Sequence, residues 1–154
     1  EGDFEFLAPG VTRVTLPDST NATFLHLSVF HPLDGVPPVF GIEIILGLIM
    51  ASYHFNNRIA TVVPRLAELG SCDIKFSMDI FDTQSKPTVA AKKLVKNVLP
   101  RRTSNNVIER RKYPTAIIGG QSSSTSELLA IMGGVEKLTQ ISFSSSANTL
   151  DNKG

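Results

Sequence analysis

The apolar positions of the chain fall into short β-branched runs that alternate with longer helical runs. Residues 23–30 are β-branched and aromatic with partial alternation, and the run stops at 31–32, where proline ends sheet pairing. This pattern predicts a strand. Residues 41–57 are rich in Ile and Leu and free of proline, which predicts a helix that packs on a sheet and is mostly buried.

The same alternation continues through the middle of the chain. Residues 74–81 carry apolar side chains at every second position, which predicts a second strand. Pro87 stands where a helix can begin, and apolar residues follow it at helical spacing, with lysines facing outward, until Pro100. The sequence therefore predicts a second helix whose lysines form a solvated face.

The last third of the chain adds two predicted strands and a third helix. Residues 115–120 form an apolar run closed by glycines, serines follow, and 127–138 are helical in pattern. Residues 140–143 predict a fourth strand. The order β-α-β-α-β-α-β implies right-handed crossovers and an α/β fold, with a parallel sheet and helices on both faces.

Three segments fall outside this alternation. Residues 1–22 precede the first strand and are interpreted as an N-terminal extension. Residues at about 100–113 are basic and almost without apolar content, which predicts a mobile loop. No aromatic residues interleave these charges, so we expect no nucleic-acid partner. Residues 59–73, which link the first helix to the second strand, have no predicted role.

The composition is that of an ordinary globular protein. Of the 154 residues, 42% are hydrophobic and 19% are charged, and 15 Lys and Arg stand against 14 Asp and Glu, so no polyanionic partner is implied. The single cysteine, Cys72, cannot form a disulfide within the chain. The most apolar run, 39–55, is interrupted by Glu43 and other polar residues, which favours a buried helix over a membrane anchor.

Two features concern the secretory pathway. Asn21 opens an N-x-T acceptor triplet and is a candidate glycosylation site. The chain starts at Glu1 rather than at methionine, without a basic start and apolar core, which suits a processed or trimmed chain.

The candidate chemistry lies in two serine-rich turns, 122–124 and 144–146. Both follow predicted strands, so both fall on the carboxyl edge of the sheet, where ligands of parallel sheets bind, and they can converge on one ligand. Hydroxyls and free N–H groups at a helix start favour an anion, for which a carboxylate or phosphate is suited. The alternative is that these serines only cap the helix and fill loops.

Other chemistries find little support. A serine nucleophile needs a base within reach, and the three histidines, His26, His31 and His54, lie in or beside the first strand and helix, so we expect no enzyme activity. No phosphate loop, dinucleotide fingerprint or metal-ligand cluster is present, so we expect no cofactor and no metal.

Residues 116–124 (AIIGGQSSS) and 140–153 (QISFSSSANTLDNK) resemble the extracellular ligand-binding domain, or Venus flytrap, of class C G-protein-coupled receptors, which belongs to the type 1 periplasmic-binding-protein-like family. Residues 30–33, 41–57 and 80–83 look like the first strands and helix of that family. The resemblance spans about 23–154 and implies the first part of ligand-binding lobe 1, a partial upper lobe. The ligand-binding residues it implies are Ser122, Ser123, Ser144, Ser145 and Ser146.

The resemblance also implies a function. The serine turns of the family hold the α-carboxylate and α-amine of an amino acid, so we expect an amino-acid-like ligand, an extracellular or cell-surface location, and any membrane attachment through a C-terminal part beyond this sequence. A homo- or heterodimer would form through helices at 89–99 and 128–138. Gln84 replaces a cysteine common in the family, and no Arg or Lys between residues 30 and 57 could hold an acidic ligand.

Two alternatives remain beside a receptor fragment. One is a non-catalytic decoy or dimerising scaffold that kept the fold of the lobe without a ligand. The other is a periplasmic-type amino-acid-binding protein, because the same serine turns occur there.

Overall fold

The computed structural model describes residues 3–8, 11–15, 23–33, 38–70 and 72–146. The regular elements follow one another as β1 (Asp3–Ala8), β2 (Val11–Thr15), β3 (Thr23–His31), α1 (Pro38–Asn56), the 3-10 helix η1 (Pro64–Leu69), β4 (Ile74–Asp82), α2 (Pro87–Lys93), the π turn η2 (Leu94–Val98), the 3-10 helix η3 (Leu99–Thr103), α3 (Val107–Arg111), β5 (Ala116–Gly119), α4 (Ser123–Val135) and β6 (Thr139–Ile141).

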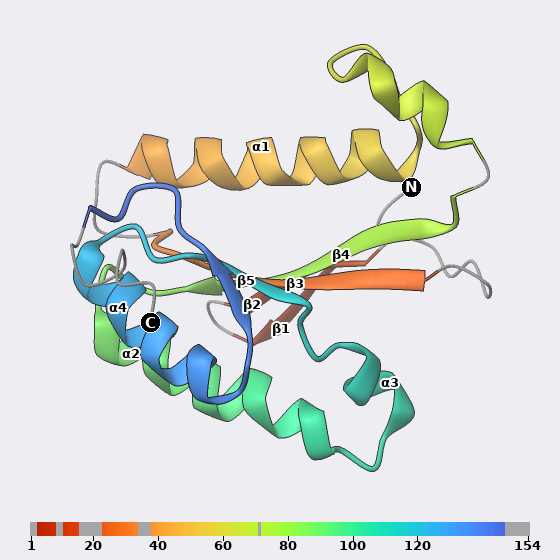
Figure 1. Cartoon of the computed structure of the whole chain (residues 1–154). Helices are drawn as coiled ribbons and strands as arrows, with labels where there is room; N and C mark the ends of the chain where they lie inside the picture. The colour runs from red at the N-terminus through yellow and green to blue at the C-terminus, as the bar shows by residue number, and fades with distance from the viewer. Residues whose placement is uncertain (1–2, 9–10, 16–22, 34–37, 71, 147–154) are drawn as a thin grey trace.

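Four parallel strands form the centre of the fold, in the order β4-β3-β5-β6. β3 pairs with β4 along its whole length and with β5 on its other side. Helix α1 covers one face of this sheet, whereas α2 and α4 cover the other (Figure 1). The predicted α/β fold, with a parallel sheet and helices on both faces, is confirmed.

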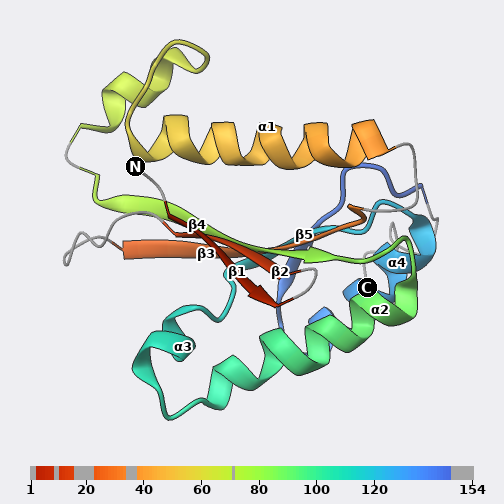
Figure 2. The same cartoon turned by 180° about the vertical axis from the view of Figure 1, so that it is seen from behind.

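The N-terminal segment adds an antiparallel hairpin that the sequence did not predict. β1 and β2 lie beside the central strands (Figure 2). They pair with each other, and β2 pairs antiparallel with β4, so the sheet has six strands. Within the predicted N-terminal extension, residues 3–8 and 11–15 are therefore part of the sheet. The available signal was the partial alternation of polar and apolar residues in 3–8 (DFEFLA), whereas 11–15 (VTRVT) do not alternate. The hairpin covers what would otherwise be the open edge of β4.

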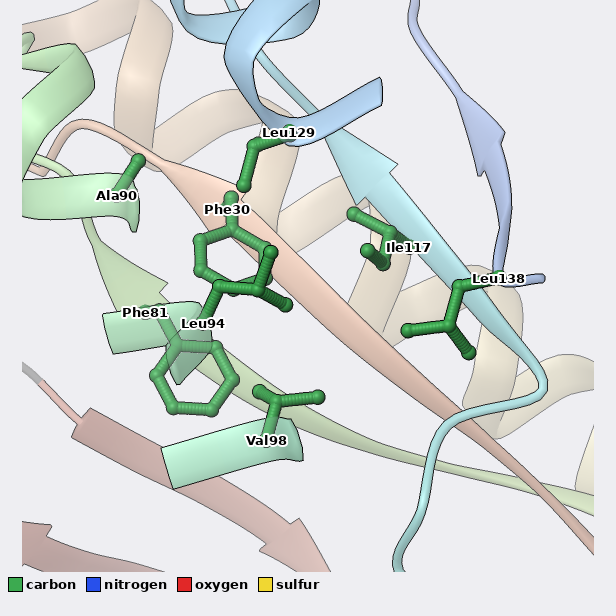
Figure 3. Packing of buried hydrophobic residues seen from close by; sticks show 8 residues of the cluster. All are labelled: Phe30, Phe81, Ala90, Leu94, Val98, Ile117, Leu129 and Leu138. Carbon is green, nitrogen blue, oxygen red and sulfur yellow. The ribbon is translucent and has the colours of Figure 1, made fainter. Parts of the chain in front are cut away.

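The core lies in two apolar layers, one on each face of the sheet. The layer beneath α2 and α4 is shown in Figure 3 and consists of Phe30, Phe81, Ala90, Leu94, Val98, Ile117, Leu129 and Leu138. On the α1 face, Val29, Ile45, Met78 and Ile80 pack together. Successive residues of β3 and β4 thus point into opposite layers, as expected for parallel strands that are buried on both faces.

Helix α1 is less buried than predicted. Its inner face contributes Ile45 to the core, but Ile42, Leu46, Met50 and Tyr53 are each between 51% and 60% exposed. The apolar residues run around the whole helix, and one sheet face can cover only one stripe of them. Nothing among the described residues covers the outer stripe.

The basic segment at about 100–113, which the sequence predicts as a mobile loop, contains the end of η3 and all of α3. Arg101 is only 8% exposed, and its Nη1 lies 2.7 Å from Oδ2 of the fully buried Asp79. The same nitrogen donates to the Lys112 carbonyl at 3.2 Å. One buried guanidinium therefore ties both ends of the segment to the sheet. Arg102 pairs outside with Glu136 at 2.6 Å.

The long link between α1 and β4 is fixed at its two ends. The Asn56 side chain donates to the Phe76 carbonyl at 2.9 Å and accepts from the Phe76 amide at 2.7 Å, as a neighbouring strand would. Arg58 donates to the carbonyls of Phe55, Cys72 and Ile74. These hydrogen bonds hold the end of α1 next to the start of β4, so the two ends of the link lie close together.

Candidate functional site

The first serine turn is the amino-terminal end of helix α4. Ser122 is the N-cap, and its Oγ accepts from the Thr125 amide at 3.3 Å. The helix starts at Ser123, earlier than the predicted 127, because this cap satisfies an amide that would otherwise lack a partner. The capping role that we weighed as an alternative thus holds for Ser122, and the turn presents the free end of a helix to the carboxyl edge of the sheet.

Two glycines let strand β5 end close to this helix. Gly119 and Gly120 have φ values of 123° and 86°, in the region that favours glycine. A Cβ atom on Gly120 would lie 2.1 Å from the Ser126 Oγ. Instead, the buried Ser126 hydroxyl donates to the Gly120 carbonyl at 2.7 Å.

The second serine turn, which follows β6, contacts the first directly. The Ser144 hydroxyl donates to the Gln121 carbonyl at 2.6 Å, and the Ser146 amide donates to the Ser123 Oγ at 3.3 Å. Below them, the Ser142 Oγ lies 3.0 Å from the Ser126 Oγ. The two turns therefore meet, as their common edge of the sheet led us to expect, and form one polar surface.

A cleft of about 280 Å³ opens beside this surface. It is lined by residues from three connections that follow parallel strands, namely Pro32, Thr83, Ser85, Gln121, Ser122 and Thr125. This volume is close to the lower end of small-ligand sites, about 300 Å³. The lining side chains are hydroxyl, amide and pyrrolidine groups without charge, and the surface they expose to the cleft is more apolar than polar, since Thr83 and Thr125 are buried.

The five predicted site residues are placed differently around the cleft. Ser122 lines it, whereas Ser123, Ser144 and Ser146 join the two turns. The Ser145 Oγ is buried and has no hydrogen-bond partner among the described residues.

Sequence reasoning missed the wall of the cleft that follows β3 and β4. Pro32, Thr83 and Ser85 come directly after these strands, on the same edge as the serine turns. The rule that ligands bind at the carboxyl ends of parallel strands could have identified these residues. Neither segment contains the run of serines that marked the other two turns.

A buried histidine lies at the carboxyl edge of the sheet. His31 is fully buried at the end of β3, its ring centroid lies 5.6 Å from that of Phe143, and neither ring nitrogen has a hydrogen-bond partner among the described residues. Burial lowers the pKa of His31, and the carboxylate of Asp82 offsets only part of that effect. This lowered pKa favours the neutral imidazole at the buried position beside Phe143.

Comparison with known proteins places the fold. No model of a known protein family matches the chain, and no curated protein sequence matches it either. A solved structure of a leucine-binding protein, LivK of Thermotoga maritima, matches with a TM-score of 0.54 and 20% sequence identity, over 84% of this chain. The chain has the fold of part of a type 1 periplasmic-binding-protein lobe. It spans 30% of the length of that structure.

Several predictions concern features that the fold does not test. Asn21, the candidate glycosylation site, lies outside the described residues. Within the described ranges, no three His, Cys, Asp or Glu side chains are grouped as ligands of a metal ion. No helix in the described part of the chain combines the length and the apolar character needed to cross a bilayer.

Proposed function

We propose that this chain is the ligand-sensing part of an extracellular, class C receptor-like protein and that it binds an amino-acid-like molecule at the cleft beside the two serine turns. The observation that carries the proposal is the contact between the two turns at the start of α4, next to an uncharged cleft. The similarity to a leucine-binding protein supports a small amino-acid ligand.

The start of α4 suits the α-carboxylate of such a ligand. Free backbone N–H groups and the positive end of the helix dipole favour an anion there. The Ser123 Oγ accepts from the Ser146 amide, which leaves its hydroxyl hydrogen to donate to a carboxylate oxygen. Carbonyl and hydroxyl oxygens of the second turn are suitable acceptors for the α-amine.

The proposed role is non-catalytic. None of the described histidines hydrogen-bonds to a serine of either turn, and the histidine that does bond a serine, His26, bonds Ser77 at 2.8 Å on the α2 face of the sheet. A serine nucleophile in the turns would lack an adjacent base.

The test is to titrate the ¹⁵N-labelled chain with free amino acids and to monitor binding by the changes in amide chemical shift. Because the cleft is bounded by only one edge of a sheet, we expect a dissociation constant on the order of 1 mM. Ser123→Ala should weaken binding by about tenfold, because a hydrogen bond to a charged group is lost. Ser124→Ala is the matched control, because the Ser124 hydroxyl is exposed and its contact with the Ser122 Oγ is a long one, 3.3 Å. Equal affinities for the two variants would contradict the proposal.

A dimerising scaffold is a second candidate, supported by one observation. Apolar residues of the α2 and α4 segments are mostly core, yet Val95, Ile131 and Val135 are 50%, 68% and 78% exposed. This surface would form the dimer that the class C resemblance implies. Sedimentation should then show a ligand-independent dimer that Ile131→Asp converts to monomer, and a wild-type monomer at high concentration would contradict this candidate.

A further inference from the structure

The β4–α2 turn lines the same cleft as the first serine turn. Thr83 and Ser85 from this turn line the cleft together with Gln121, Ser122 and Thr125. A ligand whose carboxylate lies at the start of α4 therefore shares this cleft with Thr83 and Ser85.

The turn has a conformation that its residues do not favour. The Lys86 amide donates to the Thr83 carbonyl at 2.9 Å, and the two central residues, Gln84 and Ser85, have φ values of 51° and 54°. Two successive positive φ values define a type I′ turn, in which Gly, Asn or Asp are usual. Serine at the second position costs conformational energy that glycine would avoid.

Buried contacts hold the turn in place. The Asp82 Oδ1 accepts from the amides of Leu33 and Gln84, both at 2.9 Å, and Asp82 is only 5% exposed. The Thr83 amide donates to the His31 carbonyl at 3.1 Å. One carboxylate therefore accepts hydrogen bonds from both the β3–α1 and the β4–α2 connection. Ser85 is presented to the cleft by a rigid support.

We infer that the β4–α2 turn determines ligand specificity and that the Ser85 hydroxyl hydrogen-bonds to an uncharged polar side chain of the ligand. This inference rests on the proposed function, because it assigns the other end of the same ligand. The cleft lining has no charged group to compensate a charged side chain that loses water. An apolar side chain that covered the exposed Ser85 would displace water from its hydroxyl without replacing the hydrogen bonds of that water.

The test compares free amino acids on the full ¹⁵N-labelled chain. Asparagine, serine and threonine should shift the amides of both serine turns at lower concentration than leucine, glutamate or lysine. Ser85→Gly keeps the turn geometry and removes the hydroxyl, so it should weaken asparagine binding by about threefold to tenfold and leave leucine binding unchanged. Gln84→Gly is the matched control, because it also removes a positive φ from a residue other than glycine, at an exposed position that does not line the cleft. It should leave the affinities for asparagine and for leucine unchanged.

The outcomes separate the two proposals. If amino acids bind at the serine turns but Ser85→Gly keeps the wild-type preference, or if glutamate or lysine binds as well as asparagine, the specificity assignment is wrong and the proposed function stands. If no amino acid shifts either turn, the proposed function and this inference are both overturned. A loss of binding in Gln84→Gly as large as in Ser85→Gly would show that turn strain, rather than the hydroxyl, is what matters, and would also overturn the assignment.

Discussion

Replacing Ser126 by alanine tests whether the two serine turns are held together as the structure describes. Ser126 is fully buried, its hydroxyl donates to the Gly120 carbonyl at 2.7 Å, and its Oγ lies 3.0 Å from that of Ser142. Each such bond contributes about 0.5–1.5 kcal/mol, and a buried group left without its partner costs up to about 3 kcal/mol. In the variant, the single hydroxyl hydrogen of Ser142, whose Oγ lies 3.2 Å from the Gly120 carbonyl oxygen, is available to that carbonyl. The expected loss of unfolding free energy is therefore about 1–3 kcal/mol.

Urea unfolding followed by circular dichroism measures this loss. The midpoint should fall while the slope with denaturant stays constant, because the surface exposed on unfolding is unchanged. Ser124→Ala, in the same helical turn but exposed, should change the stability by less than about 0.5 kcal/mol. Equal stabilities of the Ser126 and Ser124 variants would refute the claim that Ser126 joins β5, α4 and the second turn.

Two further predictions concern buried charge. Because burial lowers the pKa of His31 below its ordinary value of 6.5, the unfolded state takes up a proton first as the pH falls, so stability should be full above about pH 6.5 and decrease below it. His31→Leu should remove this component in urea unfolding between about pH 7.5 and pH 5, whereas His54→Gln should retain it; the same acid sensitivity in His31→Leu would contradict the assignment. Arg101→Met leaves the Asp79 carboxylate buried without its guanidinium and should cost about 3–5 kcal/mol, and Asp79→Leu added to it should recover much of that loss; additive losses would count against a buried pair.

The central α/β unit was predictable because its signals are local. The period-two runs at 23–30 and 74–81 and the helical run at 41–57 each carry their own pattern, and alternation of the two types implies parallel strands. The β1–β2 hairpin was missed because only residues 3–8 alternate in part and those of 11–15 do not. Its strands are short, and β2 pairs with β4, which lies far along the chain.

The features that the sequence did not predict depend on contacts between distant residues. The basic segment was interpreted as a loop because its composition is polar, but Arg101 is buried by pairing with Asp79, which no local pattern reveals. The exposed stripe of α1 has the opposite cause, since apolar composition predicts burial without saying which face meets the sheet.

For the candidate site, sequence reasoning identified the edge of the sheet but only part of its wall. Ser122 was found because serines cluster at a strand end, and it lines the cleft. Thr83 and Ser85 lie on the same edge but belong to no cluster of serines. The type I′ turn that contains Ser85 could not be predicted from Gln84 and Ser85, because such turns usually have Gly, Asn or Asp at these two positions.

The most direct test of the account is where an amino acid lies on the folded chain. Intermolecular nuclear Overhauser effects between asparagine and the labelled protein should connect the ligand's α proton with Ser122 and Thr125, and its side chain with Ser85. Contacts confined to the exposed stripe of α1, or no contacts at a ligand concentration well above about 1 mM, would contradict the account that the serine turns and the β4–α2 turn form a ligand site.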